Sequence, residues 1–231
     1  MYRSINPAAV VETINQLRSR VEERFPGSGL SKVAAELQLI GNQSVGRSAW
    51  IGQPQWALRA GIAALIVLPI FIFVSAVVPL HLSARVQSWV EFIQGFESGI
   101  NSVVLIGAAI FFLFTIEVRI KRHRALKALH ELRALAHIID MHQLTKDPER
   151  VRNTGPSTRS SPKRVMTDFE LTRYLDYCSE MLSLTGKIAA LYVQGFDDPV
   201  VLSAVDQIED LTTSLSRKIW QKITILNEGR K

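Results

Sequence analysis

Apolar residues are concentrated in two blocks of this chain instead of recurring at helical spacing along it. No charged residue occurs from Ala60 to Leu80 or from Ser98 to Ile116, whereas charges recur every few residues elsewhere. About 20 apolar residues are needed for a helix to cross the hydrocarbon core of a membrane. A chain of 231 residues could hardly bury two helices that are apolar on every face. The pattern therefore predicts two transmembrane helices, over about residues 60–80 and 99–116.

Basic residues lie on one side of this predicted hairpin. Arginine and lysine are frequent before Ala60 and after Ile116, whereas the connection over 81–98 contains a single one, Arg85. The positive-inside bias predicts that both termini are cytoplasmic and that the short connection is external. The apolar residues of that connection predict an amphipathic helix lying in the membrane interface. We expect an integral protein of a bacterial inner membrane.

The spans themselves offer no ionisable side chain. A selective ion path usually shows an intramembrane charge or a carbonyl filter, so a dedicated transporter is disfavoured. Small residues such as Gly61 and Gly107 favour close helix packing and a homo-oligomer. Pro69 stands near the middle of the first span and is expected to kink it, because proline removes one backbone hydrogen bond.

A basic cluster follows the second span directly. It consists of Arg119, Lys121, Arg122, Arg124 and Lys127. Clusters in this position bind anionic lipid headgroups, so the bilayer is the first predicted partner. A second basic group lies in residues 146–166, which are predicted to form a flexible loop. That group lacks the interleaved aromatics that bind single-stranded nucleic acid, so no nucleic-acid partner is expected despite a net charge of +6.

The remaining chain predicts amphipathic helices on either side of the hairpin. Three parts follow: N-terminal cytoplasmic helices with a linker over 1–56, the transmembrane hairpin over 57–118, and a cytoplasmic helical bundle or coiled-coil extension over 119–231. The helix of the second span is expected to continue to about Leu144, because its apolar stripe does not break before that residue. The fold class is therefore an all-α membrane protein.

Local signals mark where these helices begin and end. Asn6 and Pro7 open the first, whose predicted apolar face is Val10, Ile14, Leu17, Val21 and Phe25. Ser31 is expected to cap a short helix that ends at Gly41 and Asn42. A capping box from Thr167 to Glu170 opens the next helix after the loop. Asp198 and Pro199 open the last one, which carries an a/d-like repeat of Val201, Val205, Ile208, Thr212, Leu215, Ile219, Lys222 and Leu226.

Few residues suggest chemistry. His130, His137 and Asp140 form a polar face on the long helix, and His137 and Asp140 are close enough in sequence to touch. The spacing of the histidines does not suit chelation of one ion, and ordinary surface histidines are the plainer interpretation. Cys178 lies in an apolar stripe and is interpreted as a packing residue. No catalytic, cofactor-binding or metal site is predicted, and the chain is not expected to be an enzyme.

The layout from about Ala57 to Leu144 resembles the two-span effector modules of bacterial nucleotide-triggered defence systems. Those modules also place a helical hairpin in the membrane before cytoplasmic helices, but this chain shows no nucleotide-sensing domain. The resemblance implies a membrane-permeabilising effector or small channel as one hypothesis. The leading hypothesis is a non-enzymatic oligomeric anchor whose cytoplasmic helices recruit or sense a protein partner. A membrane enzyme that uses the His137 and Asp140 face is the third.

Overall fold

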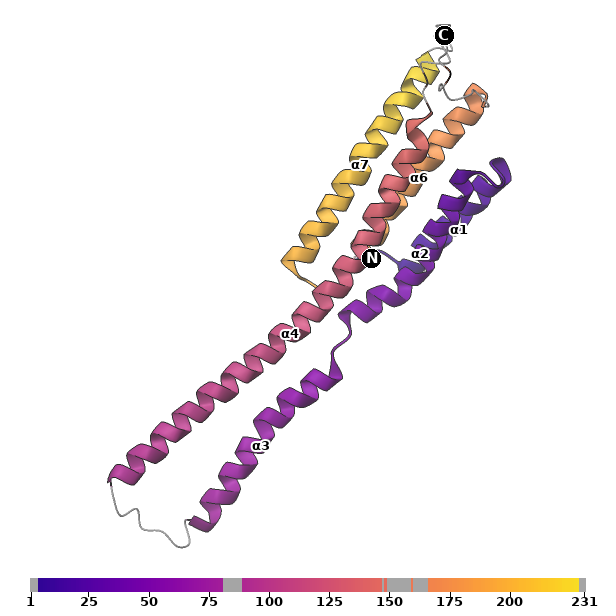
Figure 1. Cartoon of the computed structure of the whole chain (residues 1–231). Helices are drawn as coiled ribbons and strands as arrows, with labels where there is room; N and C mark the ends of the chain where they lie inside the picture. Colours follow the sequence, from indigo (N-terminus) through magenta and orange to yellow (C-terminus); the bar gives the residue numbers. More distant parts are fainter. Residues whose placement is uncertain (1–3, 81–88, 147, 149–158, 160–165, 229–231) are drawn as a thin grey trace. The chain divides into compact units, whose positions relative to one another are not determined.

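The computed structural model describes residues 4–80, 89–146, 148, 159 and 166–228 (Figure 1). Their regular structure is α-helical, with no strand in these ranges. The helices are α1 (Pro7–Arg24), α2 (Gly29–Gly52), α3 (Trp56–Leu80), α4 (Trp89–Leu144), α6 (Asp168–Leu191) and α7 (Pro199–Glu228). The chain forms two compact units, one of Met1–Gly52 with Arg122–Lys231 and the other of Gln53–Lys121. The all-α prediction is confirmed.

The first unit is a helical bundle with a continuous apolar core, drawn from α1, α2, the C-terminal part of α4, α6 and α7. In α1 the side chain of Asn6 accepts a hydrogen bond from the Ala8 amide, and Pro7 is the first helical residue, as predicted. The predicted apolar face of α1 is buried from Val10 to Phe25. The predicted bundle is therefore present, and a coiled-coil extension stays a prediction.

The second helix differs from its prediction at both ends. Its start is capped by Ser28 and not by Ser31, because the Ser28 hydroxyl accepts the Ser31 amide at 3.1 Å. The helix also continues past Gly41 to Gly52. A Cβ atom placed on Gly41 would lie 2.7 Å from Cδ1 of Ile14, so this glycine allows α1 to approach α2 closely. The predicted stop at Gly41 is wrong because that glycine serves packing and does not end the helix.

Two alanine substitutions in α2 distinguish these roles of glycine. Gly46 has open space around it, so Gly46→Ala should stabilise the protein by about 0.5–1 kcal/mol through helix propensity. Gly41→Ala should instead destabilise it by about 1–2 kcal/mol, because overpacking against Ile14 outweighs the same gain. Chemical denaturation of the full chain in detergent, followed by circular dichroism, measures both. Equal effects of the two substitutions would contradict close packing at Gly41.

The C-terminal helices follow the predicted signals. Thr167 and Glu170 form the capping box of α6, and α7 begins at Pro199. The predicted stripe of α7 is buried except at Lys222, whose Nζ donates to the backbone oxygen and Oε1 of Gln143. The neighbouring Ile223 is buried in its place.

Cys178 is fully buried in α6, as expected for a packing residue, and burial raises the pKa of its thiol to about 12. The loop predicted over 146–166 lies outside the described residues, apart from 146, 148, 159 and 166.

The second unit contains α3 and the N-terminal part of α4. By length and composition, two helical stretches are apolar enough to cross a membrane, one reaching Ile72 and the other beginning at Ile93. The most apolar windows of these stretches are 0% and 6% buried, so their apolar side chains are almost uncovered by the rest of the chain. Pro69 lies within α3, which continues on both sides of it, and the kink stays a prediction.

The predicted interfacial helix over 81–98 falls partly outside the described residues, which exclude 81–88. From Trp89 onward this segment is the beginning of α4, so the second apolar helix starts ten residues before the predicted boundary at Gly99. Nothing from Trp89 to Gly99 breaks the helix, because Gly95 and Gly99 are tolerated inside it with open space around both.

Candidate functional site

In the bundle α7 runs beside α4 (Figure 1). A groove of about 490 Å³ lies between residues 123–133 of α4 and residues 204–208 of α7. The two helices run in the same direction, because Arg122 pairs with Asp198, Arg133 with Gln207, and Gln143 with Lys222. The groove is lined from α4 by His123, Leu126, Lys127, Leu129, His130 and Arg133, and from α7 by Ala204, Gln207 and Ile208.

The chemistry of this groove is an apolar floor beneath a basic rim. Leu126, Leu129 and Ile208 supply the floor, and none of the nine lining residues is acidic. His123, Lys127 and His130 are exposed and follow one another at spacings of four and three, which places them on one face of α4. Arg133 is the last α4 residue that lines the groove, and its Nη2 donates to Oε1 of Gln207 at 2.6 Å. Such a surface suits an apolar segment flanked by carboxylates.

One end of the groove is held by an ion pair between Arg122 and Asp198. Nε of Arg122 donates to both carboxylate oxygens at 3.1 Å, and Nη2 donates to Oδ2 at 2.8 Å. Asp198 is 3% exposed and also accepts the Val200 and Val201 amides, so it caps the first turn of α7. Burial acts to raise the pKa of this carboxyl, but the hydrogen bonds from Arg122 and the two amides outweigh it. The pKa of Asp198 therefore lies below its ordinary value.

Comparison of the chain with models of known protein families, with curated proteins and with solved structures finds no match.

The predicted lipid-binding cluster is largely engaged in contacts within the protein. Lys121 pairs with Glu117 at 2.9 Å, and Arg122 pairs with Asp198. The guanidinium of Arg124 lies 3.9 Å from the ring centroid of Trp50, a cation–π contact that joins α4 to α2. The two other members, Arg119 and Lys127, are exposed. Lipid binding by this cluster stays a prediction, and Lys127 belongs to the α4–α7 groove.

The predicted polar face separates into unrelated residues. His130 joins the groove, whereas His137 is exposed and does not line it. Asp140 accepts a hydrogen bond from Gln143. Within the described ranges, no group of three or more His, Cys, Asp or Glu residues is arranged to hold a metal ion.

Sequence reasoning missed His123 and Arg133 as partners of Lys127 and His130. The signal was present, because His123, His130 and His137 recur one heptad apart on α4. Their significance depended on knowing that α7 lies beside the first two.

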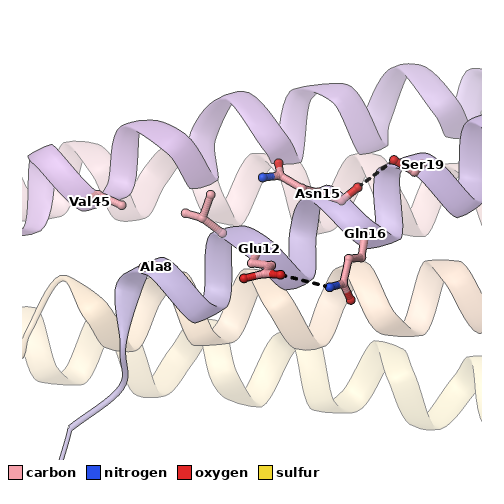
Figure 2. A pocket seen from close by; sticks show the side chains of 7 residues that line it. Ala8, Glu12, Asn15, Gln16, Ser19 and Val45 are labelled. Atoms are coloured by element: carbon pink, nitrogen blue, oxygen red, sulfur yellow. Dashed lines mark hydrogen bonds between the residues drawn. The ribbon is translucent and has the colours of Figure 1, made fainter.

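Two other hollows carry less chemistry. The larger, about 610 Å³, lies along α1 and is completed by Val45 of α2 (Figure 2). Its polar side chains are satisfied locally, since Gln16 donates to Glu12 and the Ser19 hydroxyl donates to the Asn15 carbonyl.

The third hollow contains Arg20, Arg24 and Arg173, from α1 and α6. Each of these arginines has a partner: Arg20 pairs with Glu180, Arg173 pairs with Asp176, and Arg24 lies over Phe169. Arg20 and Arg24 therefore connect α1 to α6, whereas Arg173 is paired within α6. Among the three hollows described, the α4–α7 groove presents His123, Lys127 and His130 without such a partner in the described residues, around an apolar floor.

Proposed function

We propose that this chain is a non-enzymatic, oligomeric membrane anchor whose cytoplasmic helices form a protein-binding platform. The observation that carries the proposal is the contrast between its two units. Residues 53–121 hold apolar windows that are almost wholly uncovered, whereas the remaining unit buries a continuous apolar core. Uncovered apolar surface of this extent requires a non-aqueous environment or a partner. A bilayer, with both termini in the cytoplasm of a bacterial cell, supplies that environment.

Polar groups within residues 53–121 support a lipid environment. The hydroxyls of Ser75, Ser102 and Thr115 donate to backbone oxygens of Ile72, Ser98 and Phe111 in their own helices. Such internal satisfaction is what a polar group needs in hydrocarbon, where water is absent. These hydroxyls are therefore compatible with direct exposure to lipid.

Aromatic and charged residues lie at the ends of the same two helices. Trp56 begins α3 and Trp89 begins α4, and both are highly exposed, at 75% and 83%. Tryptophan is favoured at both membrane–water interfaces. Glu117 pairs with Arg59 at 3.5 Å and with Lys121 at 2.9 Å, which fixes the first turn of α3 beside α4. This pairing supports an antiparallel hairpin whose charged end lies at one interface.

Protein binding, whether by a partner or by a second copy of the chain, is supported by the α4–α7 groove. Its lining includes two histidines, but no serine, threonine, cysteine or carboxylate that could act as a nucleophile or orient a histidine base. A cleft of this composition is typical of surfaces that bind an acidic amphipathic segment.

Purification of the full-length chain in mild detergent tests the proposal. Native mass and covalent crosslinking in membranes should show a homo-oligomer, and affinity capture should add a stoichiometric cytoplasmic partner. A monomer without partners would contradict the proposal. The permeabilising alternative has its own readout in the same preparation, because it predicts dye release from liposomes containing the pure protein. Dye release without a partner would favour that alternative over an anchor.

A further inference from the structure

The outward side of α7 carries an acidic and apolar stripe. Its members are Leu202, Asp206, Glu209 and Thr213, all exposed and separated by four, three and four residues. This spacing places them on one face of the helix. Leu202 is 38% exposed, which leaves apolar surface one turn before the first of the two carboxylates. Neither Asp206 nor Glu209 takes part in an ion pair among the described residues.

This stripe and the α4–α7 groove lie on opposite sides of α7. An α-helix turns about 100° per residue, so the stripe is centred roughly 180° from the groove-lining Ala204, Gln207 and Ile208. The acidic stripe of one copy therefore cannot enter its own groove. It can enter the groove of a neighbouring copy.

We propose that the acidic stripe of α7 in one copy docks into the α4–α7 groove of a second copy. Charge complementarity carries the assignment, because the groove has a rim of Lys127, Arg133 and two histidines with no carboxylate. The stripe supplies Asp206 and Glu209, three residues apart, as are Lys127 and His130. The two members of each pair are therefore separated by about 4.5 Å along the helix axis. Leu202 provides an apolar side chain for the floor.

The contact is head to tail, since each copy uses two different surfaces. Heterologous contacts of this kind close into a ring when the rotation between copies permits and otherwise extend into a filament. The inference rests on the oligomer of the proposed function and assigns its interface. The recruited partner then binds elsewhere on the assembled platform.

Charge reversal with complementation tests this interface in full-length protein. The groove variant Lys127→Glu with Arg133→Glu should lose self-association by at least tenfold in native mass and crosslinking. The stripe variant Asp206→Lys with Glu209→Lys should lose it equally. Each variant reverses one surface and leaves the other intact, so an equimolar mixture should assemble into alternating oligomers. Circular dichroism of each variant verifies that its helices form.

Matched controls reverse the same number of charges at exposed positions away from both surfaces. Lys32→Glu with Arg18→Glu controls the groove variant, and Glu23→Lys with Glu36→Lys controls the stripe variant. Both controls should assemble like the wild type. If the groove variant and the stripe variant each assembled as well as the wild type, the inference would be overturned and the oligomeric anchor would stand. Two monomeric variants whose mixture stays monomeric would also overturn it.

A wild-type monomer bound to a different protein would overturn the self-docking interface and retain the recruiting role. A wild-type monomer without any partner would overturn both proposals. The two proposals are therefore separable in one set of measurements.

Discussion

Asp198→Ala is expected to lower the free energy of unfolding by about 2–4 kcal/mol, combining loss of a helix cap with loss of charge-assisted hydrogen bonds. Asp198 is 3% exposed and serves both the α7 amides and Arg122. Arg122 keeps partial access to water, with 37% of its side chain exposed, so leaving it unpaired costs less than it would deep in a core. Denaturant unfolding of the full chain in detergent, followed by circular dichroism, gives the value.

Two further substitutions separate the roles of Asp198. Asn is an equally good cap without the charge, so Asp198→Asn should lose about half as much stability as Asp198→Ala. The adjacent Asp197 is exposed, so Asp197→Ala should change stability by less than about 0.5 kcal/mol. Similar losses at Asp197 and Asp198 would show that the clamp with Arg122 does not hold α7.

The dependence on pH follows from the lowered pKa of Asp198. A carboxyl whose pKa is lower in the folded than in the unfolded protein adds stability above its unfolded pKa. That stability is lost as pH falls through the folded pKa. The difference in unfolding free energy between wild type and Asp198→Asn should therefore be constant near neutral pH. It should shrink below about pH 4, the ordinary range of aspartate. A difference that is unchanged down to pH 2 would contradict the ion pair.

Features encoded by adjacent residues were predictable from the sequence. The Asn6 and Pro7 start, the capping box at Thr167 and the start at Pro199 each depend on a few neighbouring side chains and backbone amides. The apolar stripes were predictable for the same reason, because helical periodicity identifies a buried face without identifying its partner.

Features that depend on distant residues were not predictable in this way. The close approach at Gly41 is to Ile14, which is 27 residues away, so the role of Gly41 as a packing position has no local signature. Arg122 was assigned to lipid by its position after the second span, whereas its partner Asp198 lies 76 residues further along the chain. A run of basic residues in the sequence does not show whether lipid headgroups or carboxylates of the same chain neutralise their charge.

The candidate groove was predictable only in part from the sequence. Lys127 and His130 were identified separately, one as a lipid ligand and the other as part of a polar face. Their common role required the placement of α7 beside α4, which brings Ala204 and Ile208 under their side chains. The alignment of one helix along another is set by the whole core. The periodicity of α4 alone therefore could not predict which residues of α7 lie opposite Lys127 and His130.

Charged residues in the apolar stretches are expected to abolish stable membrane integration. Ile70 and Leu105 lie near the centres of the predicted spans over 60–80 and 99–116 and are 58% and 71% exposed. An aspartate at the centre of a transmembrane helix costs about 2.5–3.5 kcal/mol on insertion scales, so Ile70→Asp with Leu105→Asp should cost about 5–7 kcal/mol. We expect this double variant to be released from membranes by alkaline extraction, whereas the wild type is retained.

The chain offers a matched control for this prediction. Met141 is an equally exposed apolar residue of α4, at 68%, but it lies in the bundle unit. Met141→Asp should leave membrane retention unchanged, because the side chain at position 141 faces water whether or not residues 53–121 are inserted in a membrane. If the uncovered apolar surface served only a soluble protein partner, the wild type itself would be released by alkaline extraction. Retention of the wild type and of Met141→Asp, with loss of the double variant, would assign the apolar surface of residues 53–121 to lipid.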